Sequence, residues 1–108
     1  MTVNGKSLKY VIDGTTLKGA HKGFVKIPVV PKAKLIEKIF LMDNDIINLD
    51  GIDSYRNLKV LSLENNKITK LNEIKKLSHL PLQNINIQLN PVTKLPFYEQ
   101  FVVANIPP

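Results

Sequence analysis

The chain has 108 residues, 44% of them hydrophobic, so it is long enough for one globular domain and too short for two. It contains no cysteine, which excludes a disulfide framework, a thiolate zinc site and a cysteine nucleophile. No apolar run approaches the ~18 residues of a membrane-spanning helix, and residues 1–14 lack a secretory signal core, so we expect an intracellular, cytoplasmic protein.

The formal net charge of +6 is concentrated in the first third of the chain. Residues 1–34 contain seven lysines and one aspartate, whereas residues 35–108 contain eight basic and eight acidic residues. This contrast predicts a basic N-terminal arm or cap, residues 1–34, followed by a neutral domain rich in Leu, Ile and Asn, residues 35–108.

The N-terminal segment contains two β-like stretches, "LKYVIDG" and "GFVKIPVV", separated by glycine-containing sequence. They form either a hairpin that protects the first strand of the following domain or an extended arm that orders on a partner, and we favour the arm. An anionic partner, either an acidic protein tail or RNA, would suit its charge. Because the arm has no arginine and only two aromatic residues, we prefer a protein. The basic arm residues expected to make contact are Lys18, Lys22, Lys26, Lys32 and Lys34.

Three segments of the next region share one pattern: "IEKIFLMDNDI" from Ile36, "LKVLSLENNKI" from Leu58 and "LQNINIQLNPV" from Leu82. Each has apolar residues at positions 1, 4, 6 and 11 and asparagine at position 9, and the units begin 22 and 24 residues apart. Positions 3–5 predict a short strand whose positions 4 and 6 point inward and stack on those of the neighbouring units. The asparagines are expected to satisfy buried backbone groups rather than only to form turns. They are Asn44, Asn66 and Asn90.

The last residues predict a cap over the final unit. Asn90-Pro91 ends the last strand, and the apolar residues that follow recur at helical spacing, which indicates a short amphipathic helix. We expect a minimal cap, a truncated form, or a partner that covers the remaining edge. The apolar helix residues are Phe97, Tyr98, Phe101, Val102 and Ile106.

This pattern resembles the leucine-rich repeat, L-x-x-L-x-L-x-x-N-x-L, over roughly residues 35–106. The unit length is similar to the 22-residue class typified by the regulatory subunit of protein phosphatase 1. The resemblance implies an α/β solenoid with a parallel sheet on its concave face and short helices or 3₁₀ turns on its convex side. It also implies a non-catalytic protein–protein interaction module within a larger assembly. Because members of this class occur in such settings, we favour a cytoskeletal or ciliary assembly, with a ribonucleoprotein subunit that contacts RNA, or a phosphatase regulatory module, as alternatives.

In this architecture positions 3, 5 and 7 of each unit are exposed on the concave face. Three of these residues, Phe40, Met42 and Val60, are apolar, so they either anchor a partner or are covered by the N-terminal segment. The candidate partner-binding residues are Lys38, Phe40, Met42, Val60, Ser62, Glu64, Asn84, Asn86 and Gln88.

No catalytic motif is complete in this sequence. "GKS" at residues 5–7 lacks the upstream glycine of a phosphate-binding loop, and the acidic stretch at residues 43–53 lacks the glycine and glutamate of a calcium loop. His21 and His79 have no partners at metal-ligand spacing. We therefore expect no enzyme activity, no metal and no cofactor.

Overall fold

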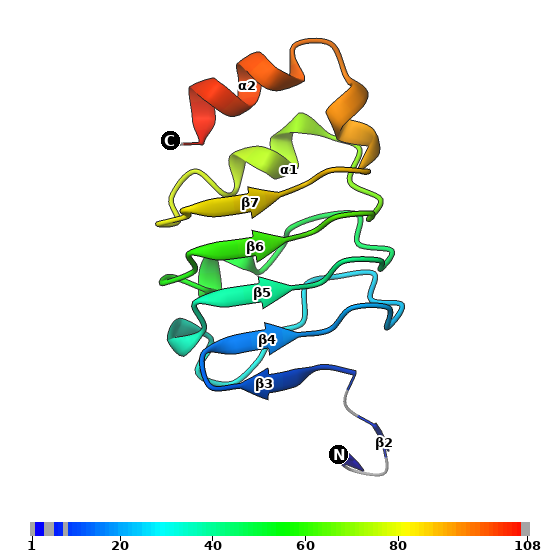
Figure 1. Ribbon diagram of the computed structural model, residues 1–108, viewed down its shortest axis with the longest axis vertical. Coiled ribbons are helices and arrows are strands. Elements are labelled where there is room, and N and C mark those ends of the chain that lie inside the picture. The colour runs from blue at the N-terminus through cyan, green and yellow to red at the C-terminus, as the bar shows by residue number, and fades with distance from the viewer. Residues whose placement is uncertain (1, 4–5, 8, 107–108) are drawn as a thin grey trace.

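The computed structural model describes residues 2–3, 6–7 and 9–106 of the chain, which form an elongated stack of repeating turns, 45 × 24 × 17 Å (Figure 1). Five strands form one sheet in chain order: β3 (Val11–Asp13), β4 (Thr16–Lys18), β5 (Lys38–Phe40), β6 (Val60–Ser62) and β7 (Asn84–Asn86). β3 and β4 pair as an antiparallel hairpin, and β4 to β7 are parallel. The predicted α/β solenoid with a parallel sheet is confirmed.

Short helical segments lie behind the sheet, between successive strands and after the last strand, β7 (Figure 1). They are the 3₁₀ turns η1 (Ala33–Leu35), η2 (Ile52–Ser54) and η3 (Pro91–Lys94) and the helices α1 (Leu71–Lys75) and α2 (Tyr98–Asn105). A separate antiparallel pair, β1 (Thr2–Val3) and β2 (Lys6–Ser7), precedes the sheet. Within the residues that the structure describes, no helix has the length and apolar character needed to cross a bilayer.

The core is a stack of apolar side chains from equivalent positions of successive repeats. Leu17, Ile39 and Leu61 are neighbours in register and at most 1% exposed, and Ile85 continues the same column. The spacing along the chain is 22 residues for the first two steps and 24 for the third. Since each residue of the column is covered by the neighbouring repeats, no repeat could bury its apolar face alone.

The extended arm favoured for the N-terminal segment is wrong for residues 9–34. These residues form an additional repeat, in which β4 supplies the first rung of the parallel sheet and Ile27 and Val30 enter the core. Gly19 occupies the place of a stacked leucine, and the Phe24 ring fills the space that a side chain there would take. The burial of this apolar surface against β5 holds the segment on the solenoid.

The first repeat lacks its own asparagine, and the asparagine of the following repeat binds its backbone. Asn44 accepts hydrogen bonds from the backbone N–H groups of Lys22 (3.0 Å) and Phe24 (3.1 Å) and donates to the Gly19 carbonyl (2.9 Å). The buried Tyr55 hydroxyl donates to the Pro28 carbonyl of the same repeat. Two polar side chains of the second repeat therefore fix the backbone of the first.

The three asparagines form a ladder along the solenoid, and each is at most 4% exposed. Asn66 accepts from the Ile46 N–H (3.1 Å), and Asn90 accepts from the Ile68 N–H (3.1 Å). Each side-chain amide also donates to the carbonyls of the strand ends in its own repeat and in the preceding one. The shared carbonyls are Leu41, which accepts from Asn44 and Asn66, and Leu63, which accepts from Asn66 and Asn90.

Candidate functional site

The outward side of the strands brings the nine candidate residues into three columns. Lys38, Val60 and Asn84 are partners in register. Phe40, Ser62 and Asn86 form the next column, two residues further along each strand. Met42, Glu64 and Gln88 lie beyond the strand ends, where backbone hydrogen bonds from Asp43 to Glu64 and from Asn65 to Gln88 keep the repeats aligned.

These residues differ in how far they reach solvent. Lys38, Asn84 and Gln88 are exposed, whereas Phe40, Met42, Val60, Glu64 and Asn86 are partly buried. Ser62 is only 8% exposed, so its prediction as an exposed residue is wrong. Its short side chain lies in register between Phe40 and Asn86, and these longer neighbours shield it.

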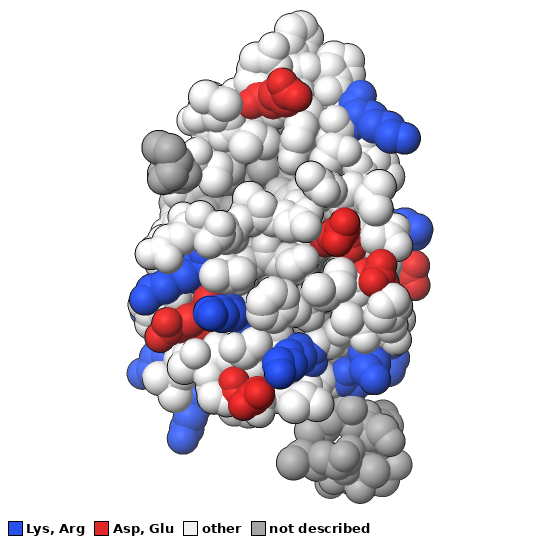
Figure 2. Space-filling view, viewed as in Figure 1, with Lys and Arg blue, Asp and Glu red and all other residues white. Residues whose placement is uncertain are grey.

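The apolar part of this face consists of Phe40, Met42 and Val60, which we call the strand-face patch. Residues 9–34 do not cover this patch, contrary to one of the two alternatives. Their strand β4 lies beside β5 in the sheet and not across its face. Lys18 and Lys38 adjoin the patch on the N-terminal side, and amide side chains follow it on the C-terminal side. Figure 2, in the view of Figure 1, shows an uncharged centre with charged side chains mainly around the margins and over the N-terminal half.

The basic residues of the first repeat are all exposed, but the fold does not gather them into one cluster. Lys18 lies on β4 and pairs with Asp13 at 3.2 Å. Lys22 and Lys26 lie in the segment that leaves the strand, and Lys34 lies in η1. Lys32 precedes η1 in a left-handed conformation. An anion that binds at one point would therefore meet only some of these lysines.

A polar column borders the strand face at the position after the third candidate column. Asp43 accepts a hydrogen bond from Asn65 at 2.9 Å and lies 2.9 Å from the His21 imidazole. All three residues have a left-handed backbone with φ between 57° and 60°. This arrangement links repeats and is no metal site, since the described residues contain no cluster of three or more potential His, Cys, Asp or Glu ligands.

Leu89 is the fourth member of this column and its one apolar residue. The sequence patterns did not single it out. Leu89 has φ of 60°, like its equivalents, but it is apolar and 67% exposed. The left-handed region is unfavourable for a branched residue, and asparagine or aspartate tolerates it better. The signal was present in the alignment of the three units, where Leu89 stands opposite Asp43 and Asn65.

On the convex side, Lys76 bridges two repeats. Its ammonium group lies 2.6 Å from Asp50 and 2.8 Å from Glu73, and these hydrogen bonds raise the pKa of Lys76. Glu73 also accepts the Leu49 N–H at 2.7 Å. His79 lines a cavity of about 310 Å³ next to this pair. These contacts link the segment just before η2 to α1 and to the residue that follows it, so the cluster has a structural role.

Comparison with known proteins identifies the repeat. Over 71 residues, the chain is 37% identical to leucine-rich repeat-containing protein 51 of Rattus norvegicus and of Mus musculus, and 35% identical to that of Bos taurus. The chain is a leucine-rich-repeat protein. The matched segment is 64% of this chain and 37% of each relative, so this leucine-rich-repeat chain corresponds to well under half of their length. No family model matches the chain.

The solved structures give the same fold. A chain from the crystal structure of the Drosophila melanogaster SNF/U2A′ complex matches with a TM-score of 0.78 and covers 86% of this chain and 55% of its own. The two are 22% identical, so the likeness concerns the leucine-rich-repeat fold alone. Solenoids of this kind use their extended concave surfaces for binding.

Proposed function

We propose that this leucine-rich-repeat protein is a non-catalytic interaction module that binds a protein partner on its strand face, as a subunit of a larger assembly. The observation that carries the proposal is the strand-face patch. Phe40, Met42 and Val60 point outward and are not part of the buried core. Aromatic and methionine side chains are enriched at protein interfaces, where they fill pockets of the partner.

The rigidity of the strand face supports this proposal. The patch lies on and next to strands whose ends are held by buried asparagines, and Phe40 and Val60 each have a fixed neighbour in register. A preorganised surface loses little conformational entropy when it binds. The match to a chain from a complex of two proteins, SNF and U2A′, supports a protein as the partner.

The side chains around the patch define the partner's chemistry. Lys18 and Lys38 favour acidic groups at the N-terminal side, and Asn84, Asn86 and Gln88 offer hydrogen bonds at the other side. The proposed partner presents apolar side chains with carboxylates toward the first repeats. A cytoskeletal or ciliary assembly is the proposed setting, supported by the repeat class alone.

A second candidate is a ribonucleoprotein subunit that contacts RNA through the five exposed lysines of the first repeat. The lysine charge favours phosphate in general. The distribution of these lysines around the repeat and the absence of arginine from residues 1–34 weigh against base recognition. The protein partner therefore remains the first proposal.

The experiment is purification of the tagged chain from its native cells, with identification of the molecules that co-purify. The double variant Phe40→Ala/Met42→Ala should lose the partner, with an affinity at least about tenfold lower. The matched control is Val25→Ala/Val29→Ala, which changes two side chains that are 56% and 72% exposed elsewhere on the surface. Equal binding by the folded double variant and the control would refute the strand-face proposal. Binding that RNase removes and that weakens steeply with salt would favour RNA.

A further inference from the structure

The last strand of the sheet has an open edge. In each earlier repeat, the residue just after the strand donates its backbone N–H to the carbonyl of the last residue of the next strand. Ile87 is the equivalent residue after β7, and among the described residues its N–H has no acceptor. An edge of this kind is a template for a further strand. The three bonds that set the pattern run from Gly19 to Phe40 (2.9 Å), from Leu41 to Ser62 (3.0 Å) and from Leu63 to Asn86 (2.8 Å).

The apolar core is also incomplete at this edge. Leu17, Ile39 and Leu61 are at most 1% exposed, but Ile85, the next member of the same column, is only partly buried. The difference arises because the first three are covered by the following repeat and Ile85 is not. A further apolar side chain in the same column would complete its burial.

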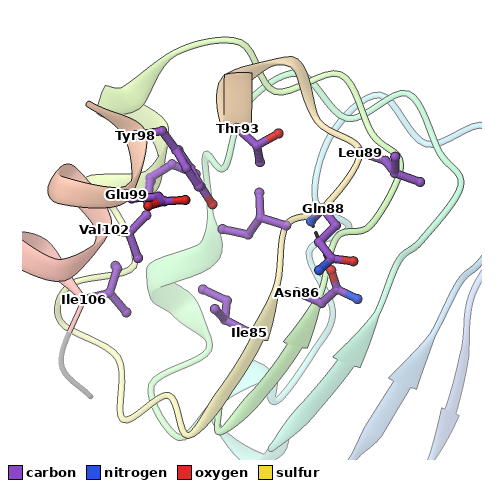
Figure 3. A pocket seen from close by; sticks show the side chains of 11 residues that line it. Ile85, Asn86, Gln88, Leu89, Thr93, Tyr98, Glu99, Val102 and Ile106 are labelled. Carbon is purple, nitrogen blue, oxygen red and sulfur yellow. Dashed lines mark hydrogen bonds between the residues drawn. The ribbon is translucent and has the colours of Figure 1, made fainter. Parts of the chain in front are cut away.

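A groove of about 740 Å³ lies between β7 and α2. Figure 3 shows Ile85 from the strand side opposite Tyr98, Val102 and Ile106 from the helix side. None of the residues of α2 is fully buried, so the helix stands partly away from the sheet edge. The volume is within the ~300–1,000 Å³ typical of binding clefts.

The charge of the groove limits what can enter it. Glu99 is the one carboxylate or lysine side chain among the described residues that line it. A carboxylate brought against Glu99 would be repelled, and a lysine or arginine would be attracted. This preference is opposite to that of the lysine-bearing N-terminal side of the strand face, so the two surfaces select different partners.

Leu89 gives independent support for a contact here. It lines the groove, and it combines an unfavourable backbone conformation with a 67% exposed apolar side chain. The described residues contain no contact that buries this side chain. Strained and exposed residues of this kind concentrate at ligand contacts.

We propose that the β7 edge and the groove under α2 form a second binding site, separate from the strand face, for an extended segment of another protein that pairs parallel to β7. The segment has apolar side chains at alternate positions, facing Ile85 and α2, and a basic residue near Glu99. A free segment fits better than a second copy of this chain, because α2 lies over the same edge in each copy (Figure 1).

The pattern of backbone bonds makes a sharp test possible. The backbone groups of outward-facing residues bond to the preceding strand, as the acceptor carbonyls of Phe40, Ser62 and Asn86 show. The probe is the peptide acetyl-Lys-Thr-Ile-Thr-Ile-Thr-Ile-Thr-Lys-amide, with isoleucines facing the core and threonines outward. N-methylation of the threonines should lower its affinity at least about tenfold, because it blocks the bonds to β7, and N-methylation of the isoleucines should change it by less than about threefold. Titration of isotope-labelled protein by NMR measures both affinities and the hydrogen exchange of the Ile87 amide.

Two protein variants on α2 provide a matched pair. Val102→Asn places a polar group in the groove and should lower the affinity at least about fivefold. Val103→Asn changes a neighbouring side chain that is 81% exposed and outside the groove, so it should bind as the native chain does. If Val102→Asn does not fold, the two N-methylated peptides still test the site on the native chain. Three results would each overturn the proposal. The two N-methylations could have equal effects, or the NMR signals of Ile85 and Ile87 could show no saturable shifts. The third is protection of the Ile87 amide from hydrogen exchange that depends only on protein concentration.

Discussion

The substitution Asn66→Ala removes four hydrogen bonds from the centre of the molecule. The Ile46 N–H loses its acceptor, and the carbonyls of Leu41, Leu63 and Glu64 each lose a donor. The effects are unequal, because Leu41 keeps its bond from Asn44 (2.9 Å) and Leu63 keeps its bond from Asn90 (2.8 Å). Only the Ile46 N–H is left buried without a partner.

The cost follows from this inventory. A buried N–H without a partner costs about 1–3 kcal/mol, and each of the two short bonds from the side-chain amide contributes about 0.5–1.5 kcal/mol, so we expect a loss of roughly 2–6 kcal/mol. A domain of this kind has a free energy of unfolding of about 5–15 kcal/mol, so the loss should be visible as a large shift of the urea midpoint. Circular dichroism during urea titration measures it, with an unchanged slope as the sign of an intact two-state transition.

Asn66→Asp separates the amide function from turn formation. Aspartate forms turns as well as asparagine does, but it cannot donate to Leu41 and Leu63 and would bring a carboxylate against their carbonyls. We expect it to destabilise at least as much as alanine. Asn72→Ala, on an exposed position of α1, is the matched control and should change stability by less than about 0.5 kcal/mol. A loss below about 1 kcal/mol for both Asn66 variants would refute the ladder argument.

Three further predictions concern stability. Burial raises the pKa of Tyr55 to about 12 from 10.0, so on raising the pH the unfolded chain loses this proton before the folded chain does. The stability contribution is fully present below pH 10, and the free energy of unfolding should fall by up to about 2.7 kcal/mol as the pH passes 12. Urea midpoints across this pH range should decline less for Tyr55→Phe than for the native chain. Part of the remaining decline comes from Tyr98, because burial raises the pKa of this residue too. Equal declines in the variant and the native chain would contradict the assignment to Tyr55. Gly19→Ala should cost about 1–3 kcal/mol, because its Cβ would lie 2.9 Å from side-chain atoms of Leu41 and Phe24, and Phe24→Leu in the same chain should recover part of the thermal stability. Leu89→Asn should stabilise the free protein by about 1 kcal/mol in thermal unfolding, and a loss of stability would show that Leu89 serves the fold.

Three of the four repeats could be recognised in the sequence because their stacking residues are large aliphatic side chains and each unit has its own asparagine. The first repeat could not be recognised in this way, because other residues supply what the repeat pattern lacks there. Gly19 leaves a space that Phe24 fills, and the position of the asparagine is taken by Lys22, whose own N–H is bound by Asn44 of the next repeat. A pattern search judges each unit by its own residues, whereas a solenoid satisfies each unit partly through its neighbour.

The candidate surface could be predicted only in part. The alternation of a strand correctly places Phe40 and Val60 on the outward side, since this depends on backbone geometry alone. The exposure of Ser62 depends on the length of the side chains on either side of it, and the groove at β7 depends on where α2 lies. Neither is a property of the local sequence.

Because the carbonyls of Leu41 and Leu63 each accept from the asparagines of two repeats, opening one repeat weakens the next. Such sharing makes unfolding cooperative along the molecule and suppresses fraying in its middle. Among the residues that the structure describes, the carbonyl of Ile87 accepts only from Asn90, so cooperativity ends there. Native-state hydrogen exchange should therefore be slowest in β5 and β6 and fastest toward β7. A segment that docked on β7 would make this end as slow to exchange as the centre.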